Sequence, residues 1–174
     1  MITTSGMSTM NAVKLVDRTQ DRQIEQVRNA PQHARAIETF RERMGDIETV
    51  DDLMKDQELY VFMMRAFDLE DQIFGKGLMR KVLESDRDEK TSLVNRLTDP
   101  RIKALHEALD FREGGKLNFN TLSSRWREEM VDIYVERQMI NGHRETNAPV
   151  GDILEFRKKA PEITSWFDVF KDKP

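Results

Sequence analysis

Helix-start signals followed by apolar residues three and four positions apart recur along this chain, and they constrain its fold most. The clearest is Asp99-Pro100, because an aspartate at the N-cap accepts free backbone N–H groups and a proline supplies a helical φ. Thr49 with Asp52 matches a capping box, and Asp56 is a third start signal. No stretch shows sustained alternation of apolar and polar residues, and no Asn-Gly or Asp-Gly hairpin joins two apolar runs. The sequence therefore predicts an all-α protein.

The short periodic segments and frequent breaks predict an irregular multi-helix array or an orthogonal bundle of about eight helices. One predicted helix covers residues 69–83, with Phe74 and Leu78 on its apolar stripe. Gly75 and Gly77 lie inside this range. Because glycine costs about 1 kcal/mol relative to alanine in a helix, the two glycines indicate a close helix crossing.

A long helix is predicted over residues 121–141, with Leu122 on its inner side and Gly142 as its C-terminal stop. We expect residues 143–149 to form a loop and residues 150–159 to form the next helix.

The length of 174 residues fits a single domain. Residues 1–11 are rich in Ser, Thr and Met, and they are predicted to be a mobile N-terminal arm. Residues 12–174 are predicted to form a single helical domain. The ten methionines are interpreted mainly as filling for an irregular helical core, although methionine also suits adaptable binding surfaces.

Two segments align without gaps and indicate a partial internal repeat. Residues 40–57 overlie residues 156–173, and each pattern predicts a helix, a break, a short helix and an aspartate. The alternative is that helix-capping patterns recur in any helical protein. The identical pairs are Phe40/Phe156, Arg41/Arg157, Ile47/Ile163, Asp52/Asp168, Lys55/Lys171 and Asp56/Asp172.

The chain ends on SWFDVFKDKP, where Asp172 is placed to start a helix for which no residues follow. We therefore expect the natural chain to continue beyond Pro174, so that the domain is truncated at its C-terminus. Trp166, Phe167 and Phe170 are then predicted to form an apolar patch that faces a partner.

The composition and charge exclude several classes of protein. The chain has no cysteine, which excludes disulfide scaffolds, thiolate zinc sites and cysteine nucleophiles. The formal net charge is -4 and the basic residues interleave with acidic ones, so nucleic acid binding has no electrostatic footprint. No apolar run reaches the roughly 20 residues that span a bilayer, and the N-terminus lacks a secretory signal. We therefore predict a cytoplasmic protein.

No catalytic or metal-binding pattern stands out. The three histidines, His33, His106 and His143, are far apart, and His106 is predicted to be solvated on the polar side of its helix. Residues 86–97 begin like a calcium loop but lack the glycine and the glutamate that its geometry needs. Acidic pairs are interpreted as solvated faces or first-turn residues. We predict that the protein is not an enzyme and has no cofactor or metal.

Residues 53–111 carry motifs that go beyond general helical patterns. The motifs are Ala66-Phe67-x-Leu69-Glu70, Met79-Arg80-Lys81-Val82-Leu83-Glu84-Ser85, Ser92-Leu93-Val94-Asn95-Arg96-Leu97, Asp99-Pro100-Arg101 and Leu109-Asp110-Phe111. This region resembles an alphaproteobacterial family, domain of unknown function 1217. The resemblance implies an all-helical fold, no established activity and no catalytic residues. It also implies a link to motility, since members of the family are often encoded near flagellar genes.

Two functions from different classes fit these observations. The first is a non-enzymatic helical interaction protein that binds a protein partner and assists flagellar assembly or regulation. The second is a helical domain that binds a small apolar ligand in a cavity lined by Met63, Phe67, Phe74 and Met79, for which a solid core is the alternative. An enzyme with a dispersed carboxylate site would instead need a pocket with two or more buried acids.

Overall fold

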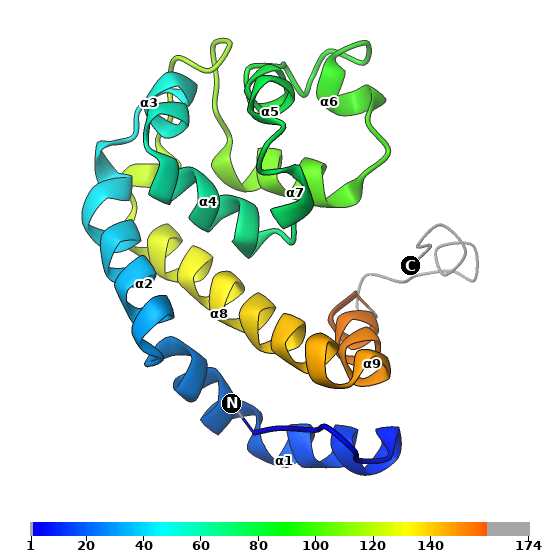
Figure 1. Ribbon diagram of the computed structural model, residues 1–174. Coiled ribbons are helices and arrows are strands. Elements are labelled where there is room, and N and C mark those ends of the chain that lie inside the picture. Colours follow the sequence, from blue (N-terminus) through cyan, green and yellow to red (C-terminus); the bar gives the residue numbers. More distant parts are fainter. Residues whose placement is uncertain (1, 160–174) are drawn as a thin grey trace. The chain divides into compact units, whose positions relative to one another are not determined.

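The computed structural model describes residues 2–159, which form an irregular all-α array with no β-strand in that range (Figure 1). The predicted fold class is confirmed. The α-helices of this part are α1 (Thr9–Arg28), α2 (Pro31–Arg43), α3 (Val50–Lys55), α4 (Gln57–Ala66), α5 (Lys76–Leu83), α6 (Leu93–Arg96), α7 (Pro100–Leu109), α8 (Ser124–Thr146) and α9 (Ala148–Lys159). Three short 3-10 helices join them, namely η1 (Met44–Asp46), η2 (Glu70–Gln72) and η3 (Asn120–Leu122).

The predicted helix starts are confirmed by their hydrogen bonds. At the start of α7, the Asp99 carboxylate accepts a backbone N–H of the first turn at 2.9 Å. Thr49 and Asp52 make both bonds of the capping box at the start of α3. Asp56 accepts a backbone N–H of α4 at 3.1 Å. Each such cap stabilises its helix by about 1 kcal/mol.

The described residues cluster into two compact units. One unit consists of residues 27–138, and the other consists of residues 2–26 together with residues 139–159. Helix α1 belongs mainly to the second of these units, and α8 contributes residues to both. The predicted division into a mobile arm and a single domain stays a prediction.

In the unit of residues 27–138, an aromatic stack holds α2 against α4. Phe40 of α2 stacks on Phe62 of α4 with ring centroids 4.2 Å apart, and Phe62 stacks on Tyr134 of α8 at 4.2 Å. All three rings are buried. Stacked aromatic pairs stabilise a core by about 0.5–1.5 kcal/mol beyond the burial of their area. The stack therefore fixes the positions of three helices relative to one another.

Helices α5, α6 and α7 lie together in the same unit, and α3 packs on α4 and α5 (Figure 1). The turn that follows α7 returns to α3, where the backbone N–H of Val50 donates to the carbonyl of Gly115 at 2.8 Å. Gly115 has a φ of +86°, and an added Cβ would lie 2.8 Å from the Val50 side chain. Both the backbone conformation and the lack of space require glycine at this position.

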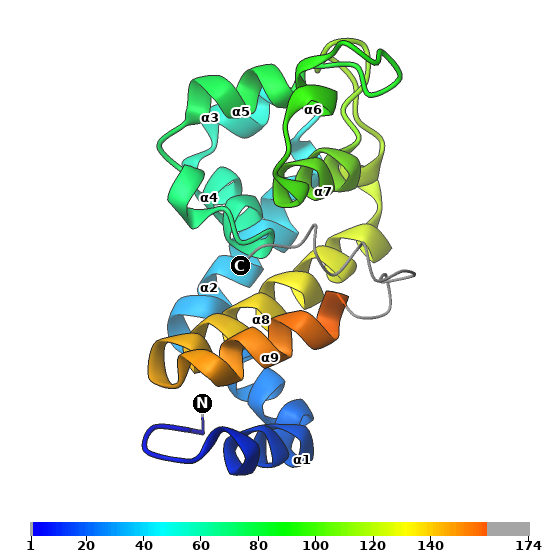
Figure 2. The same ribbon diagram turned by 90° about the vertical axis from the view of Figure 1, so that its right-hand side faces the viewer.

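In the other unit, α9 runs beside the C-terminal end of α8 (Figure 2). The two helices approach closely at Gly151, where an added Cβ would lie 2.5 Å from the Cβ of Arg144. The N-terminal residues are tied to this pair of helices. Thr4 is fully buried, and the Asn147 side chain, between α8 and α9, donates to the Thr4 carbonyl at 3.2 Å.

His143 lies at the centre of this unit and is fully buried. Its Nε2 is 2.8 Å from Oε1 of Gln23 in α1, and its Nδ1 is 3.3 Å from the hydroxyl of Thr4. Burial lowers the pKa of His143, so the ring is neutral at neutral pH. The histidine thus joins α1, α8 and the N-terminal residues through uncharged hydrogen bonds.

The predicted helix over residues 69–83 is wrong in its first half. η2 and a turn occupy that half, Gly75 is the N-cap, and α5 covers only the second half. Phe74 is therefore 98% exposed and Leu78 is 40% exposed, instead of lying on a buried stripe. A Cβ on Gly77 would meet no atom within 4 Å, so a close helix crossing does not explain this glycine.

The predicted boundaries of the long helix over residues 121–141 are also wrong. Leu122 belongs to η3 and is 60% exposed. At the other end, Gly142 does not stop α8, which continues to Thr146. The helix continues because its next residue, His143, is buried and hydrogen-bonded on both sides of its ring.

The first pair of equivalent residues in the predicted repeat lies in two different environments in the structure. Phe40 is fully buried, whereas its counterpart Phe156 on α9 is 54% exposed. The second copy from residue 160 onward lies outside the described residues.

Candidate functional site

A groove of about 270 Å³ lies between α2 and α4 in the unit of residues 27–138. Since an α-helix has 3.6 residues per turn, residues three and four apart on each helix face the same groove. We call it the α2–α4 groove. Its lining consists of Gln32, Arg35, Ala36 and Thr39 from α2, Gln57, Glu58, Val61, Phe62 and Arg65 from α4, and Tyr134 from α8.

Aromatic rings contribute a buried apolar surface to the groove. Phe62 and Tyr134 are 3% and 1% exposed, and their rings stack on each other. The Tyr134 hydroxyl shares a 3.0 Å hydrogen bond with Nδ1 of His33, whose ring meets the Tyr134 ring edge-on. This bond holds the hydroxyl near the N-terminal end of α2.

Burial sets the protonation of this tyrosine–histidine pair. It raises the pKa of Tyr134, and it lowers the pKa of His33, which the positive charge of Arg65 lowers further. At neutral pH the tyrosine is therefore a neutral phenol and the histidine a neutral imidazole. The pair contributes hydrogen-bonding groups but no charge.

The charged side chains of the groove differ in their ion pairs. Glu58 accepts a hydrogen bond from Arg43 at 2.6 Å, and Arg65 donates to Glu70 at 2.7 Å. Arg35 makes no ion pair with any side chain of residues 2–159. The groove therefore has one guanidinium whose charge no neighbouring carboxylate in this part of the chain balances.

The carboxylates of the groove do not match those of a dispersed acid–base enzyme. Glu58 is the one carboxylate among the lining residues, and its side chain is 60% exposed. The hypothesis of a carboxylate enzyme needs two or more buried acids in one pocket, which this groove does not contain.

The three histidines lie in separate surroundings. His33 contacts Tyr134, and His143 lies in the other unit. His106 is 4% exposed, and its Nε2 is 3.0 Å from the carbonyl oxygen of Ser85. The prediction that His106 is solvated is wrong, because the packing of α7 against α5 and α6 covers it.

Residues 2–159 contain neither a cluster of metal-ligating side chains nor a membrane-spanning helix. No group of three or more His, Asp and Glu side chains in this range is arranged to hold a metal ion. No helix in this range combines the length and the apolar character needed to cross a bilayer.

Of the four residues predicted to line an apolar ligand cavity, one lies on the surface. Met63 and Met79 are 1% and 0% exposed, and Phe67 is half-buried. Phe74 faces solvent and so lines no internal cavity with them. The predicted patch of Trp166, Phe167 and Phe170 lies outside the described residues and stays a prediction.

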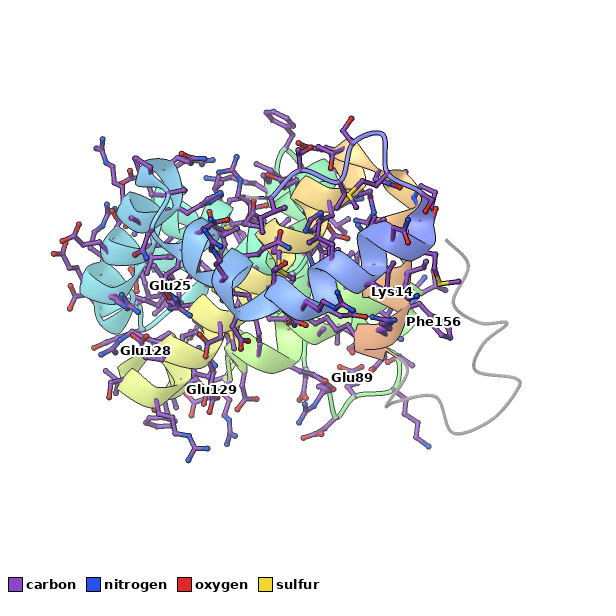
Figure 3. The ribbon with its side chains drawn as sticks, turned by 90° about the horizontal axis from the view of Figure 1, so that it is seen from below. Lys14, Glu25, Glu89, Glu128, Glu129 and Phe156 are labelled. Atoms are coloured by element: carbon purple, nitrogen blue, oxygen red, sulfur yellow. The ribbon has the colours of Figure 1, made fainter. Side chains whose placement is uncertain are left out.

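Several large apolar side chains are exposed, and none of them lines the groove. One of them, Phe156, is labelled on the surface of α9 in Figure 3. In the unit of residues 27–138 these side chains are Phe74, Leu78, Phe119 and Leu122, and in the other unit they are Met7, Met10 and Phe156.

The sequence prediction did not single out the groove. Gln32, Arg35 and Thr39 have helical spacing, but such a polar series on one helix also fits a solvated face. In the sequence, these three polar residues are interspersed with the apolar Ile37 and Phe40, which are buried in the structure. This pattern does not identify the helix that forms the opposite side of the groove.

The chain is similar to a protein family and to a solved structure. A profile of the family described as "Protein of unknown function (DUF1217)" matches residues 66–174. The crystal structure of protein AGR_C_984 from Agrobacterium tumefaciens is 29% identical, with a TM-score of 0.85. The similarity covers 99% of this chain and 74% of that chain. A search of curated proteins found no match.

Proposed function

The chain belongs to the DUF1217 family of proteins of unknown function, and on this premise we propose that it is a non-enzymatic helical interaction protein. In this proposal the α2–α4 groove binds a segment of a partner protein. The observation that carries the proposal is the groove itself, which combines buried aromatic rings with a polar rim.

The composition of the groove suits a protein partner. Phe62 and Tyr134 are rigid and apolar, while Gln32 and Arg35 present hydrogen-bond donors at the rim. Aromatic residues and arginine are the types most enriched at the centres of protein interfaces. The volume of about 270 Å³ is below the roughly 300–1,000 Å³ of typical small-molecule sites, and it suits a few side chains of a peptide.

The partner that we propose is a flagellar component, and the proposed location is the cytoplasm. The support for this step is the family resemblance, since members are often encoded near flagellar genes. The alternative, a small apolar ligand in the helical core, has weaker support because Phe74, one of its four predicted lining residues, faces solvent.

The test is a capture experiment with a blocked groove. Thr39→Trp places a large ring in the groove, and Gln32→Trp does so from the exposed end of the rim. Glu38→Trp adds the same ring to an exposed position of α2 that does not line the groove, and it is the matched control. Circular dichroism first verifies that each variant is folded. Tagged wild-type chain and variants are then incubated with host extract, and captured proteins are identified by mass spectrometry.

We expect a flagellar protein to be enriched by the wild type and by Glu38→Trp, but not by Thr39→Trp or Gln32→Trp. Equal capture by all four chains would show that the groove is not the binding site. Deletion of the gene is a separate test, and unchanged swimming and flagellar number would remove the flagellar part of the proposal.

A further inference from the structure

The two ends of the α2–α4 groove differ in charge. At one end, Arg43 of α2 pairs with both Glu58 and Asp56, so one guanidinium faces two carboxylates and this end has no surplus of positive charge. Arg35 precedes Arg43 by eight residues, which places it about 12 Å away along α2. Arg65 follows Glu58 by seven residues, or about 10 Å along α4. The two groove arginines therefore lie toward the opposite end.

The end of the groove that holds Arg35 and Arg65 has a surplus of positive charge. Glu70 pairs with Arg65 at 2.7 Å and balances one of the two guanidinium groups. Arg35 is exposed and makes no ion pair within the described residues. Tyr134 and His33, which meet at the same end, share a hydrogen bond and are both neutral.

Apolar surface lies directly beside this charge. Phe62 is buried and Val61 is half-buried, and both line the groove between its two ends. A ligand that satisfied Arg35 alone would leave the half-buried Val61 side chain in contact with water. A ligand with a negative group next to an apolar group would use both parts of the groove.

Resting on the proposed function, we infer that the groove binds an acidic–apolar segment of the partner protein. A carboxylate of that segment pairs with Arg35, and a neighbouring apolar side chain lies against Phe62 and Val61. A planar guanidinium accepts a carboxylate through two parallel hydrogen bonds, which fixes the direction of the bound segment.

The charge count favours a carboxylate over more highly charged groups. A phosphate group carries nearly two negative charges, and nucleic acid carries one per phosphate. Counting partners within residues 2–159, the groove offers a single unbalanced cation, Arg35, in a chain with a formal net charge of -4. One carboxylate per bound segment provides the single negative charge that balances Arg35.

The inference is tested with two blocked tripeptides, acetyl-Leu-Asp-Leu-amide and acetyl-Leu-Asn-Leu-amide, which differ in one charge. Each is titrated into the isotope-labelled full chain, and the NMR signals of α2, α4 and the Arg35 side chain are followed. We expect the aspartate peptide to bind about fivefold to tenfold more tightly than the asparagine peptide. We also expect added salt to reduce this difference.

Two variants separate the role of Arg35 from general charge effects. Arg35→Gln should abolish the preference for the aspartate peptide. Arg22→Gln removes an exposed arginine of α1, in the other unit, and should leave the preference unchanged. Circular dichroism verifies the fold of both variants.

The inference is overturned if both peptides shift the groove signals equally, if neither does so, or if Arg35→Gln keeps the preference. These results leave the capture experiment with Thr39→Trp unaffected. If Thr39→Trp still captures the partner, the proposed function fails whatever the peptides do. The two failures are therefore distinguishable.

Discussion

Replacing Gly151 with alanine tests how closely α8 and α9 approach each other. The added Cβ would lie 2.5 Å from the Cβ of Arg144 and 2.7 Å from its Cα, whereas real Cβ contacts below 3.0 Å essentially never occur. The obstructing atoms belong to the backbone and its first side-chain carbon, which cannot rotate away. Helix α9 therefore has to move away from α8, and the packing between them is partly lost.

The size of the effect follows from two opposing contributions. Overpacking of a close contact lowers the free energy of unfolding by about 2–3 kcal/mol, and the higher helix propensity of alanine raises it by about 1 kcal/mol. The free energy of unfolding should therefore fall by roughly 1–2 kcal/mol in total. A loss of 1 kcal/mol lowers the Tm of a chain of this length by about 2–4 °C. Gly77→Ala is the matched control, because its added Cβ meets no atom within 4 Å. We expect this control to gain up to about 1 kcal/mol from propensity alone.

The free energies of unfolding of Gly151→Ala and Gly77→Ala are measured by thermal and urea unfolding, with circular dichroism as the readout. Hydrogen exchange in α9 shows whether the loss is confined to the contact between α8 and α9. If Gly151→Ala stabilised the protein as Gly77→Ala does, the close contact would not exist and the reasoning would be refuted.

Three further predictions concern a cap, a buried histidine and an exposed ring. Asp99→Ala removes the N-cap of α7 and should cost about 1–2 kcal/mol in urea unfolding, whereas Thr98→Ala, at the exposed neighbouring position, should cost almost nothing. Equal losses would show that the cap is not formed. Because burial lowers the pKa of His143, the unfolded chain binds the proton more readily. The contribution of His143 to the free energy of unfolding should therefore be fully present above about pH 6.5. It should decrease as the pH drops from there toward the pKa of His143 in the folded chain. His143→Gln should flatten this slope in a series of melting temperatures, and an unchanged slope would assign the titration to other groups. Phe74→Ser should change the free energy of unfolding by less than about 0.5 kcal/mol, because the ring is 98% exposed. A loss comparable to that of a core residue would show that the ring is buried in solution.

Helix starts could be predicted from the sequence because a cap depends on residues that are close along the chain. The Asp99 carboxylate reaches the backbone N–H two residues later, and Thr49 and Asp52 bond to each other across three positions. These bonds need no partner from another part of the fold. The predicted starts of α3 and α7 are therefore correct.

The ends and interruptions of helices were predicted less well, because they depend on distant contacts. Gly142 is of a residue type that commonly ends a helix. Continuing α8 past it, however, brings His143 into contact with Gln23 and Thr4, which are far away in the sequence. Phe74 has the spacing of a buried residue, but its segment breaks into a turn and exposes the ring. Propensity is a weak preference, and tertiary packing overrides it.

The sequence by itself determined the all-α class, the capped helix starts and the family, since these depend on local hydrogen bonds, periodicity and motifs. Only the tertiary structure decided that Arg35 of α2, Arg65 of α4 and Tyr134 of α8 line one groove. The physical reason is that periodicity shows which side of a helix is apolar, but not which other helix covers it. That choice depends on the stacking of Phe40, Phe62 and Tyr134, which come from separate segments of the chain.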